Sequence, residues 1–455
     1  MSLKSINPYN GKLIKTYKEH SAEQIEKKIK QGQKTWLEFQ KTDFSFRAER
    51  MKQLAGLLIK EKEKLAKVMA LEMGKPLKDG IAEIEKCASV CEYYADKAED
   101  FLKDELIETE ATKSFVTYQP VGLVLAIMPW NFPFWQAFRF LAPALMAGNC
   151  GLLKHASNVS ACALAIEELV IQSEFPKHSF QTLLISSKKL EPIIAHPMVK
   201  AVTLTGSTGA GKKVAAQAGS LIKKTVLELG GSDAYIILED ADLELAAETC
   251  VNSRLINNGQ SCISAKRFIV VKSVEKEFTR LFKNFMAQRT SGDPLKEKYD
   301  LGPMARTDLR DDLHEQVSKS IKLGAKCILG GKIPKGKAAI YPPTILTNVK
   351  KGMPAYDEEL FGPVAAIINV KNEEEAIKIA NDSVFGLGAA VFTRDLEKGE
   401  WIAKERIEAG SCFVNSLVKS DPRLPFGGIK ESGYGRELSI FGIKEFVNIK
   451  TVYIK

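Results

Sequence analysis

The first hundred residues follow the hydrophobic period of amphipathic helices. Across residues 47–73, apolar side chains recur at near-helical spacing until Gly74 and Pro76, which end the pattern. Residues 82–102 continue in the same way. The pattern therefore predicts two long helices in this part of the chain.

Short apolar runs then begin to alternate with helical segments. Residues 113–119 alternate like a strand and end at Pro120. The later runs predicted as strands are 122–128, 150–154, 181–185, 201–205, 226–229 and 235–238, with helices at 134–147 and 160–173 and after the glycine loop 206–211. Strand–helix alternation of this kind is typical of a parallel, doubly wound sheet.

The alternation starts again at Asp242. The predicted elements are a helix to about Asn257, a strand at 267–271, a helix at 274–288, a strand at 365–370, a helix at 373–381 and a strand at 389–392. A chain of 455 residues is too long for one ordinary core, so two or three domains are expected. We therefore expect a second α/β domain here.

Composition narrows the class of protein. The hydrophobic content of 45% and charged content of 27% are typical of soluble globular proteins. The net charge of +9 is spread along the chain, as on solvated helix faces, so no nucleic-acid partner is predicted. The apolar run 121–128 is far too short to cross a bilayer, and residues 1–8 lack the apolar core of a signal peptide. We therefore expect a cytoplasmic protein without a membrane partner.

The eight cysteines are scattered along the chain without a Cys-x-x-Cys pair. Cys87 and Cys91 share a helix face, but no nearby histidine completes a zinc set. Reduced thiols in a reducing compartment are the simplest account, and no metal site is predicted.

One cysteine differs from the others in its setting, because Cys262 follows the small polar turn 258–261. A thiolate can attack a carbonyl carbon, and a carboxylate can later activate water against the resulting thioester. Glu228, which precedes Leu229 and two glycines, is a candidate carboxylate. Each signal is ambiguous alone, since most cysteines are inert and a Glu before Gly-Gly can simply end a strand. Together they suggest covalent catalysis.

The glycine loop needs a separate test, because residues 206–212 fit the first seven positions of an ATP-binding P-loop. The next position requires a Ser or Thr hydroxyl for magnesium, and Lys213 cannot replace that ligand. A glycine turn between a strand and a helix N-terminus can still hold a pyrophosphate through backbone N–H groups. The loop therefore argues against a nucleoside triphosphatase and is compatible with a bound pyrophosphate, and a turn without any ligand is the alternative.

A series of ordered motifs carries a resemblance to one family. The motifs are INP at 6–8, MPWNFP at 128–133, LKHAS at 153–157, TGS at 205–207, LELGG at 227–231, GQSC at 259–262, GPMAR at 302–306, EELFGP at 358–363 and PFGGIKESG at 425–433. With them the chain resembles the aldehyde dehydrogenase superfamily over essentially its full length, and within it the bacterial succinate-semialdehyde dehydrogenases.

The resemblance implies a domain organisation. A Rossmann-type NAD(P)-binding domain is expected in residues 1–101 and 121–228, and an α/β catalytic domain in residues 229–430. Residues 102–120 and 443–455 are expected to form a small β oligomerisation element. The family also suggests a homodimer or a homotetramer, and the C-terminal strand 451–454 would otherwise remain an exposed edge.

The resemblance further implies the catalytic roles. The Cys262 thiolate would attack the aldehyde, and the Asn131 amide with the Cys262 backbone N–H would hold the oxyanion. Glu228 would then deprotonate the water that hydrolyses the thioester. Ser264 stands where some relatives have a second cysteine, so a disulfide with Cys262 is not expected.

The implied cofactor is NADP, NAD or both. The residues that match family positions for cofactor binding are Trp130, Lys154, Ser157, Gly206, Ser207, Leu229, Glu359 and Phe361. Relatives that prefer NAD often have Glu where this chain has Ser157, which neither binds the ribose 2′-OH in that way nor repels a 2′-phosphate. Lys188 and Lys189 are candidates to pair with that phosphate. We therefore expect NADP to be used, alone or alongside NAD.

The candidate substrate-binding residues are Arg139, Arg423 and Ser420. Arg139 lies eight positions after Asn131 (139 − 131), about two helical turns, so its guanidinium is expected to reach the same tunnel and bind a distal carboxylate. The structural alternative is an arginine paired with an acid at a domain boundary. A second family arginine is absent at Ile256, and Arg423, with Ser420, is the candidate to compensate.

The expected function is NAD(P)-dependent oxidation of a short carboxylate-bearing aldehyde, first of all succinate semialdehyde to succinate, through a thiohemiacetal and a thioester. The small aldehyde is the only partner predicted apart from further copies of the chain. A broad-specificity aliphatic aldehyde dehydrogenase is the alternative. A P-loop-like nucleotide-binding protein without dehydrogenase activity is a remote one.

Overall fold

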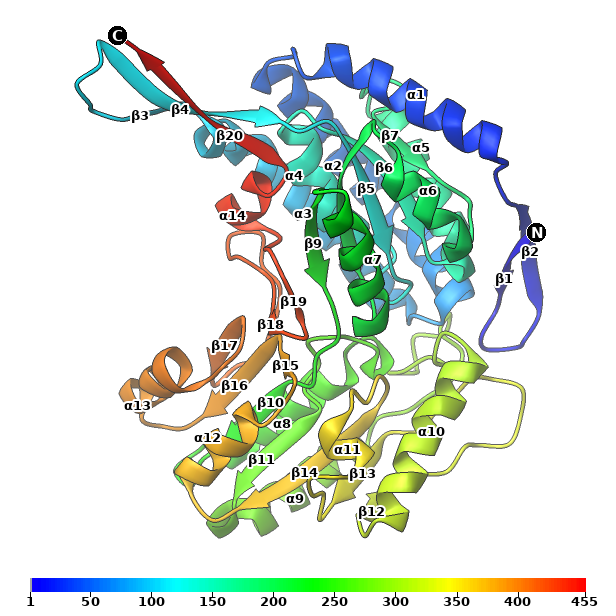
Figure 1. The fold of residues 1–455 in the computed structure, drawn as a ribbon. Helices are drawn as coiled ribbons and strands as arrows, with labels where there is room; N and C mark the ends of the chain where they lie inside the picture. The colour runs from blue at the N-terminus through cyan, green and yellow to red at the C-terminus, as the bar shows by residue number, and fades with distance from the viewer. Residues whose placement is uncertain (1) are drawn as a thin grey trace.

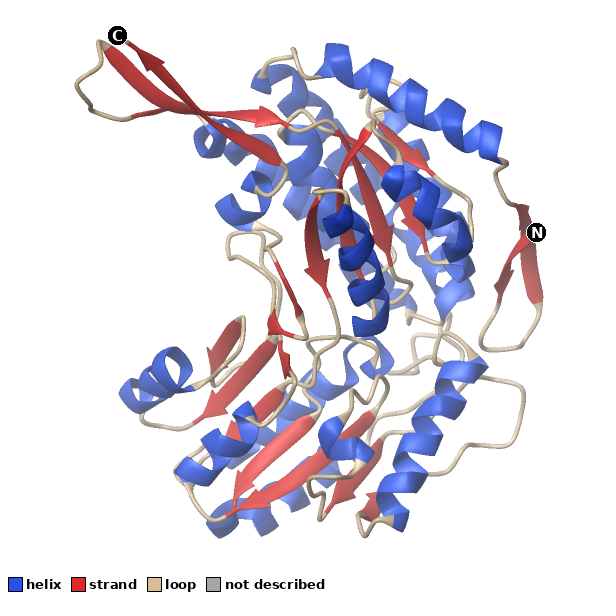
Figure 2. Ribbon diagram, in the orientation of Figure 1, coloured by secondary structure: helices blue, strands red, loops and turns tan. Residues whose placement is uncertain are grey.

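Each half of the chain builds its own largely parallel sheet, and the two sheets lie in separate lobes (Figure 1). The computed structural model describes residues 2–455. Figure 2 shows helices on both faces of the sheet in the upper lobe and along the sheet in the lower one. The prediction of a doubly wound α/β fold is confirmed.

The first sheet has six strands in the order β19-β9-β8-β5-β6-β7. Its strands are β5 (Leu123–Met128), β6 (Cys150–His155), β7 (Phe180–Thr182), β8 (Val199–Thr205), β9 (Lys224–Glu228) and the antiparallel β19 (Gly433–Tyr434). The helices between them are α4 (Trp135–Met146), α5 (Ser160–Gln172), α6 (Leu190–Ala195) and α7 (Thr208–Ser220). The predicted strand at 181–185 is therefore shorter and begins earlier.

The carboxyl ends of the parallel strands gather most of the predicted site residues at one edge. β5 ends just before Trp130 and Asn131, and β6 ends just before Ser157. β8 leads into Gly206, and Glu228 is the last residue of β9. Because ligands of doubly wound sheets bind beyond these ends, the topology itself assembles the candidate site.

Helices from the N-terminal region cover the first sheet. They are α1 (Ala22–Phe39), α2 (Phe44–Met73) and α3 (Leu77–Leu102). α2 begins earlier than predicted because the Asp43 side chain accepts the Phe46 N–H, and it ends at Gly74 with φ 81°. α1 was not predicted, although Ser21 and Gln24 form a capping box at its start.

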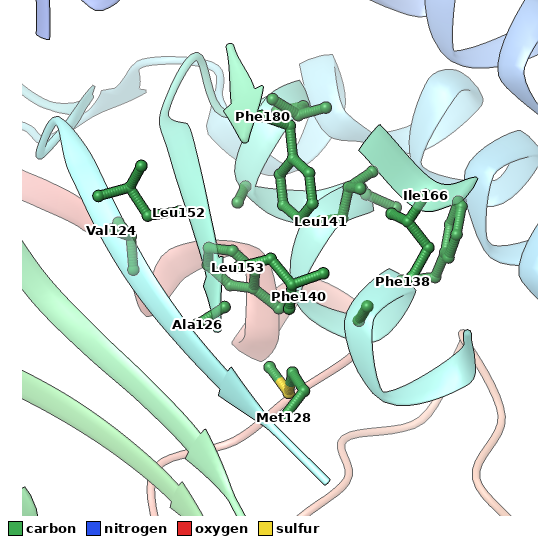
Figure 3. Close-up of a cluster of buried hydrophobic side chains, with 14 of the residues drawn as sticks. Val124, Ala126, Met128, Phe138, Phe140, Leu141, Leu152, Leu153, Ile166 and Phe180 are labelled. Atoms are coloured by element: carbon green, nitrogen blue, oxygen red, sulfur yellow. The ribbon is translucent and has the colours of Figure 1, made fainter. Parts of the chain in front are cut away.

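Part of the core of the first lobe is packed between the sheet and the helices α4 and α5 (Figure 3), and α1, α2 and α3 contribute further buried residues. Alternate residues of β5 face this core, since successive strand side chains point to opposite sides. The labelled side chains are Val124, Ala126, Met128, Phe138, Phe140, Leu141, Leu152, Leu153, Ile166 and Phe180, all of them buried. Every residue of α4 is buried, so the charged Arg139 within it needs an explanation.

The second sheet has seven strands in the order β12-β13-β14-β11-β10-β16-β17. The strands are β10 (Ala234–Ile237), β11 (Arg267–Val271), β12 (Lys326–Leu329), β13 (Thr344–Thr347), β14 (Val364–Val370), β16 (Gly388–Phe392) and β17 (Ser411–Val414). Its helices are α8 (Leu243–Leu255), α9 (Lys272–Ala287), α10 (Thr307–Lys322), α11 (Pro354–Asp357), α12 (Glu373–Asn381) and α13 (Leu396–Trp401). The predicted second α/β unit is confirmed, and α10 is an addition to it.

An arm of strands projects from the first lobe and carries the C-terminus at its tip (Figure 1). It contains β3 (Glu105–Leu106), β4 (Lys113–Pro120) and β20 (Val447–Ile454), with Val447 opposite Pro120 and Ile454 opposite Lys113. The strands predicted at 113–119 and 451–454 thus form and pair with each other. Residue 443 lies in helix α14 (Ser439–Lys444), so the β part begins later than expected.

Two small sheets complete the architecture. β1 (Ser2–Ile6) and β2 (Leu13–Lys18) form an antiparallel hairpin, and β15 (Phe385–Gly386) pairs with β18 (Ile429–Lys430). Across residues 2–455, none of the helices combines the length and apolar character needed to span a membrane.

Candidate functional site

A cavity of about 390 Å³ lies beside Cys262. Aromatic side chains form much of its wall, with Phe132, Trp135 and Phe426 among them. Its charged lining residues are the cations Lys75, Lys78, Lys86, Arg139, Arg289 and Lys419 and the acids Asp79, Glu83 and Asp300. The cavity therefore has largely apolar walls, and its cationic side chains outnumber its acidic ones.

The turn before Cys262 is rigidly left-handed. α8 ends at Leu255, and Asn257, Asn258 and Gly259 follow with φ values of 53°, 59° and 74°. Asn and Gly are the residues that best tolerate this region. A Cβ on Gly259 would lie 2.3 Å from the Gly362 carbonyl carbon, so only glycine fits there. The small polar residues of this turn therefore serve a defined left-handed conformation.

Side-chain amides of the turn fasten it to the GPMAR segment. Asn258 Nδ2 donates to the Pro303 carbonyl at 3.1 Å, and its Oδ1 accepts from the Gly302 N–H at 2.7 Å. Gln260 Oε1 accepts from the Ala305 N–H at 2.9 Å. The segment therefore acts as a brace for the nucleophile turn.

Asn131 is brought to the same turn. Its Nδ2 donates to the Gln260 carbonyl at 3.1 Å, and Asn257 Nδ2 donates to the Asn131 carbonyl at 2.6 Å. The Asn131 side chain is buried. An amide nitrogen carries two hydrogens, so one remains available to an oxyanion. The structure thus brings Asn131 and Cys262 to one turn.

Glu228 is buried at the end of β9 with neither carboxylate oxygen hydrogen-bonded to any residue between 2 and 455. Burial raises the pKa of Glu228 well above its usual range, and the nearby Glu437 raises it further while Arg139 opposes the shift. Gly231, which follows this strand end, lies against the nucleophile turn. A Cβ at this position would lie 2.7 Å from the Cys262 carbonyl oxygen.

The Cys262 thiol is half-buried and faces the cavity. Burial raises its pKa to about 12, and the charges of Arg139 and Lys266 oppose the shift. At neutral pH the sulfur therefore carries its proton in this structure. A neighbouring base has to take that proton as the sulfur attacks.

Lys266 and Glu359 form a charged cluster behind the nucleophile. Lys266 is fully buried, and its Nζ donates to the Cys262 carbonyl at 2.6 Å and the Ser261 carbonyl at 2.9 Å. The same ammonium lies 3.3 Å from Glu359 Oε1, which also accepts the Gly231 N–H at 3.1 Å. Burial raises the pKa of Glu359, and Lys266 opposes that shift. Lys266 was missed in the sequence, where it reads as one of many lysines.

The aromatic residues predicted near a nicotinamide lie together. The Trp130 and Phe361 rings meet edge to face with centroids 5.7 Å apart. Glu359 and Phe361 also line a second cavity, of about 400 Å³. The predicted neighbourhood of Trp130, Glu359 and Phe361 is therefore assembled.

The remaining cofactor candidates lie at the strand ends of the first sheet. Ser207 caps helix α7, and its Oγ accepts the Ala210 N–H at 3.4 Å. Ser157 is exposed at the start of a short 3₁₀ turn, Ser157–Val159. The Leu229 side chain packs closely on Gly211, since a Cβ added to Gly211 would lie 2.5 Å from a Leu229 methyl carbon. The exposed first turn of α7 after Gly206 suits a pyrophosphate, so these residues fit a dinucleotide.

Lysines at this edge differ in their availability. Burial lowers the pKa of Lys154, which forms no ion pair within residues 2–455. Lys189 Nζ instead donates to the His20 carbonyl at 2.7 Å and lies 3.2 Å from Glu19, whereas Lys188 is exposed. Of the predicted pair, only Lys188 is therefore free of protein partners in the described chain. Lys212 of the P-loop-like stretch is paired with Glu431 at 2.8 Å.

Arg139 combines both of its predicted settings. It lines the cavity, and its Nε lies 2.6 Å from Glu437 Oε2 in a buried ion pair. The guanidinium also lies 4.5 Å from the centroid of the Phe426 ring. Its Nη2 atom is buried and makes no hydrogen bond within residues 2–455. Its Nε and both Glu437 carboxylate oxygens likewise make no hydrogen bond within residues 2–455, so the pair with Glu437 is an electrostatic contact.

Ser420 reaches the cavity, and Arg423 does not. Ser420 is buried, and its Oγ accepts from Lys86 Nζ at 2.8 Å and from Trp135 Nε1 at 3.1 Å. Arg423 does not line the cavity; its side chain is 76% exposed and bound to Asp421 at 2.7 Å. The structure therefore does not support the expected compensation for Ile256 by Arg423.

Lys86 is a cavity residue that the sequence did not single out. It lies on α3, far from every motif in the chain, and its Nζ lies 4.3 Å from the centroid of the Trp135 ring. No local pattern marks a lysine of this kind, since lysines on amphipathic helices usually face solvent.

Comparisons with known proteins agree with this geometry. A sequence model of the Aldehyde dehydrogenase family matches residues 1–452. A protein of Synechocystis sp. named probable succinate-semialdehyde dehydrogenase [NADP(+)] is 50% identical, with all of both chains covered. Succinate-semialdehyde dehydrogenase [NADP(+)] 1 of Mycobacterium tuberculosis is 46% identical, again over the full length of both.

The solved structures extend the likeness to three dimensions. The succinic semialdehyde dehydrogenase of Streptococcus pyogenes, crystallised with NADP+, superimposes with a TM-score of 0.97. The two sequences are 37% identical, and the match covers 99% of each chain. The motifs, the two-lobed fold and these matches together place the chain in the aldehyde dehydrogenase family.

Proposed function

We propose that the protein oxidises a short carboxylate-bearing aldehyde, first of all succinate semialdehyde to succinate, with NADP or NAD as the cofactor. The observation that carries the proposal is a single cavity in which the Cys262 sulfur shares the walls with an excess of cationic side chains. Relatives of 46–50% identity bear the name of this activity with NADP(+), which supports the same substrate class.

In the proposed reaction the Cys262 thiol gives its proton to a water molecule as its sulfur attacks the aldehyde carbon. The Asn131 amide and the Cys262 backbone N–H then hold the oxyanion, an interaction worth about 10²–10³ in rate per donor. A bound nicotinamide supplies the acceptor for the hydride that leaves this carbon. What remains on Cys262 is a thioester of the product acid.

Glu228 is proposed to hydrolyse that thioester by taking a proton from water. Its burial without a protein partner supports this role, because a carboxylate of raised pKa is a stronger base when ionised. The second product, the carboxylic acid, then leaves with its new oxygen from water. Arg139 and Ser420 are proposed to orient the distal carboxylate of the substrate.

The cofactor is proposed to lie across the strand ends of the first sheet. Its adenosine and pyrophosphate parts would be held by Lys154, Ser157, Gly206, Ser207 and Leu229. Its nicotinamide end would be held by Trp130, Glu359 and Phe361. The proposed preference for NADP rests on Ser157, since no carboxylate stands there to repel a 2′-phosphate. The exposed Lys188 is a candidate to attract it.

The domain division and assembly are part of the same proposal. Residues 1–101 and 121–228 would bind the cofactor, and residues 229–430 would supply the nucleophile. The β3–β4–β20 arm would join subunits in a homodimer or homotetramer, supported by its exposed Leu106, Ile449 and Tyr453. A cytoplasmic location is proposed because all eight cysteines are free thiols.

Steady-state kinetics over a panel of aldehydes with both cofactors tests the proposal. We expect the highest kcat/KM for succinate semialdehyde with NADP. Equal kcat/KM for butanal would favour a broad aliphatic enzyme, and a hundredfold preference for NAD would overturn the cofactor assignment.

A further inference from the structure

Lys86 is placed to meet a ligand in the cavity. Helix α3 carries it to the cavity wall, where its Nζ donates to Ser420 Oγ at 2.8 Å and lies over the Trp135 ring. Both contacts hold the ammonium in one position. Neither contact neutralises its charge.

The lack of an acidic partner separates the partly buried Lys86 from Lys75, a fully buried lysine of the same cavity. Lys75 forms a buried ion pair with Glu83, and Glu83 also accepts the backbone N–H groups of Phe134 and Trp135 at 2.9 Å. Lys86 forms no ion pair with any carboxylate of residues 2–455. A largely desolvated charge without a counter-ion is costly, so the site is built to receive an anion.

The immediate surroundings of Lys86 strengthen this interpretation. Burial, together with the like charge of Arg139, lowers the pKa of Lys86 to about 8. The Arg139 guanidinium is already engaged with Glu437 through its Nε. A carboxylate between the two cations would relieve their repulsion. Lys86 is the cation of the two that has no ion pair with an acid of the described chain.

Ser420 adds a donor at the same place. Its Oγ accepts hydrogen bonds from both Lys86 and Trp135, which leaves its own O–H to donate. No protein acceptor for that hydrogen occurs in the described chain. An incoming carboxylate oxygen can accept from the hydroxyl and from the ammonium together.

We propose that Lys86 is a specificity-determining residue whose ammonium, with the Ser420 hydroxyl, binds the distal carboxylate of the aldehyde substrate. This inference rests on the proposed function and deepens it, because it names the cation that selects acidic aldehydes. Arg139, which also lines the cavity, then contributes its remaining guanidinium nitrogens while its Nε stays in the ion pair with Glu437.

The test compares Lys86→Met with the wild-type enzyme on succinate semialdehyde and on butanal. Removing a charged hydrogen-bond donor should raise KM for succinate semialdehyde about 10- to 100-fold, with kcat much less affected. KM for butanal should stay the same or fall. Lys86→Arg should restore most of the selectivity, which a merely structural residue would not require.

Lys97→Met is the matched control. It removes an exposed lysine from the same helix, so the net charge changes equally while the cavity is untouched. We expect wild-type kinetics on both aldehydes. Equal losses on both substrates in Lys86→Met, or unchanged KM for succinate semialdehyde, would overturn the assignment.

Calorimetric binding of succinate separates this inference from the proposed function. Wild-type protein should bind succinate, and Lys86→Met should bind it about 10- to 100-fold more weakly. Lys86-dependent binding in a protein that oxidises no aldehyde would refute the proposed function alone. Succinate binding that is indifferent to position 86, in an active enzyme, would refute the Lys86 assignment alone.

Discussion

Two groups of buried charges surround Cys262, and they differ in their partners. In the Lys266–Glu359 cluster, each charge is matched by the other or by a backbone group. Glu228 and Lys86, by contrast, have no counter-ion in the described chain. Glu228 is buried, and the partly buried Lys86 has only the Ser420 hydroxyl as a hydrogen-bond partner.

The difference separates groups that position the nucleophile from groups that meet a ligand. A buried ion pair holds its two side chains in one geometry. A charge without a counter-ion is stabilised only when a ligand or a water molecule binds beside it. We therefore assign the binding of water to Glu228 and the binding of a carboxylate to Lys86. Lys266 has a positioning role, because it donates to the carbonyl of Cys262 itself.

The largest effect is expected at the centre of this comparison. Cys262→Ala removes the sulfur that forms the covalent bond, so kcat should fall by at least about 10⁴-fold. Binding of NADP, followed by fluorescence titration, should remain. Cys327→Ala, at an exposed thiol, is the control and should keep full activity. A Cys262→Ala enzyme with substantial turnover would contradict the proposed chemistry.

Glu228→Gln tests the buried carboxylate that has no counter-ion. Steady-state turnover should fall by about 10²–10⁴-fold because the base is lost. The acyl-enzyme still forms, so a rapid-quench experiment should show a burst of reduced cofactor before the slow phase. A proportional loss of the burst would mean that Glu228 acts before the thioester.

The same substitution should stabilise the fold. Burial raises the folded pKa of Glu228 above its unfolded value of about 4.3, so the folded protein holds the proton more tightly. The free energy of unfolding therefore falls as pH rises between those two pKa values. Gln cannot ionise, so Tm of Glu228→Gln should exceed that of wild type at pH 8 and match it near pH 4. A lower Tm at pH 8 would contradict the unmatched state of this carboxylate.

Lys266→Met removes the cation of the Lys266–Glu359 ion pair. Glu359 would be left buried without its cation, which costs about 3–5 kcal/mol when one partner of a buried pair is removed. Tm should therefore fall, opposite to Glu228→Gln, and KM for NADP should rise about 10- to 100-fold. Lys272→Met, at an exposed position, is the control. Unchanged stability would show that the cluster does not position the loop.

The smallest effect expected is a pH dependence that arises from Lys86. Its pKa of about 8 is set by burial and Arg139, against Cys87, Glu83 and Asp421, which raise it. The ammonium is charged below that pKa and neutral above it, so KM for succinate semialdehyde should rise above pH 8, by up to about tenfold per unit. KM for butanal should not change in this range. Parallel profiles for both aldehydes would assign the titration to another group.

The motifs predicted most of the site, because they mark backbone positions. Gly206, Glu228, Asn131 and Cys262 stand where parallel strands or a left-handed turn end, and the fold brings such ends together. The two sheets and most of their helices also followed from periodicity. The roles of these residues stay predictions until the variants are measured.

Lys86, Lys266 and Glu437 were outside the reach of the sequence. Each becomes significant only through a contact between distant segments, such as Lys86 with Ser420 or Arg139 with Glu437. Arg423 is a different case, because it forms a local ion pair with Asp421 and is exposed to solvent instead of lining the cavity. Helix α1 was missed although Ser21 and Gln24 mark its start.

The central claim is that a carbonyl carbon becomes bonded to the Cys262 sulfur. Mass spectrometry of Glu228→Gln enzyme, quenched while it turns over succinate semialdehyde with NADP, tests it most directly. The account predicts the mass of one succinyl group on the peptide that contains Cys262 and none in Cys262→Ala. An unmodified Cys262 in an enzyme that is reducing its cofactor, or a succinyl group on another cysteine, would contradict it.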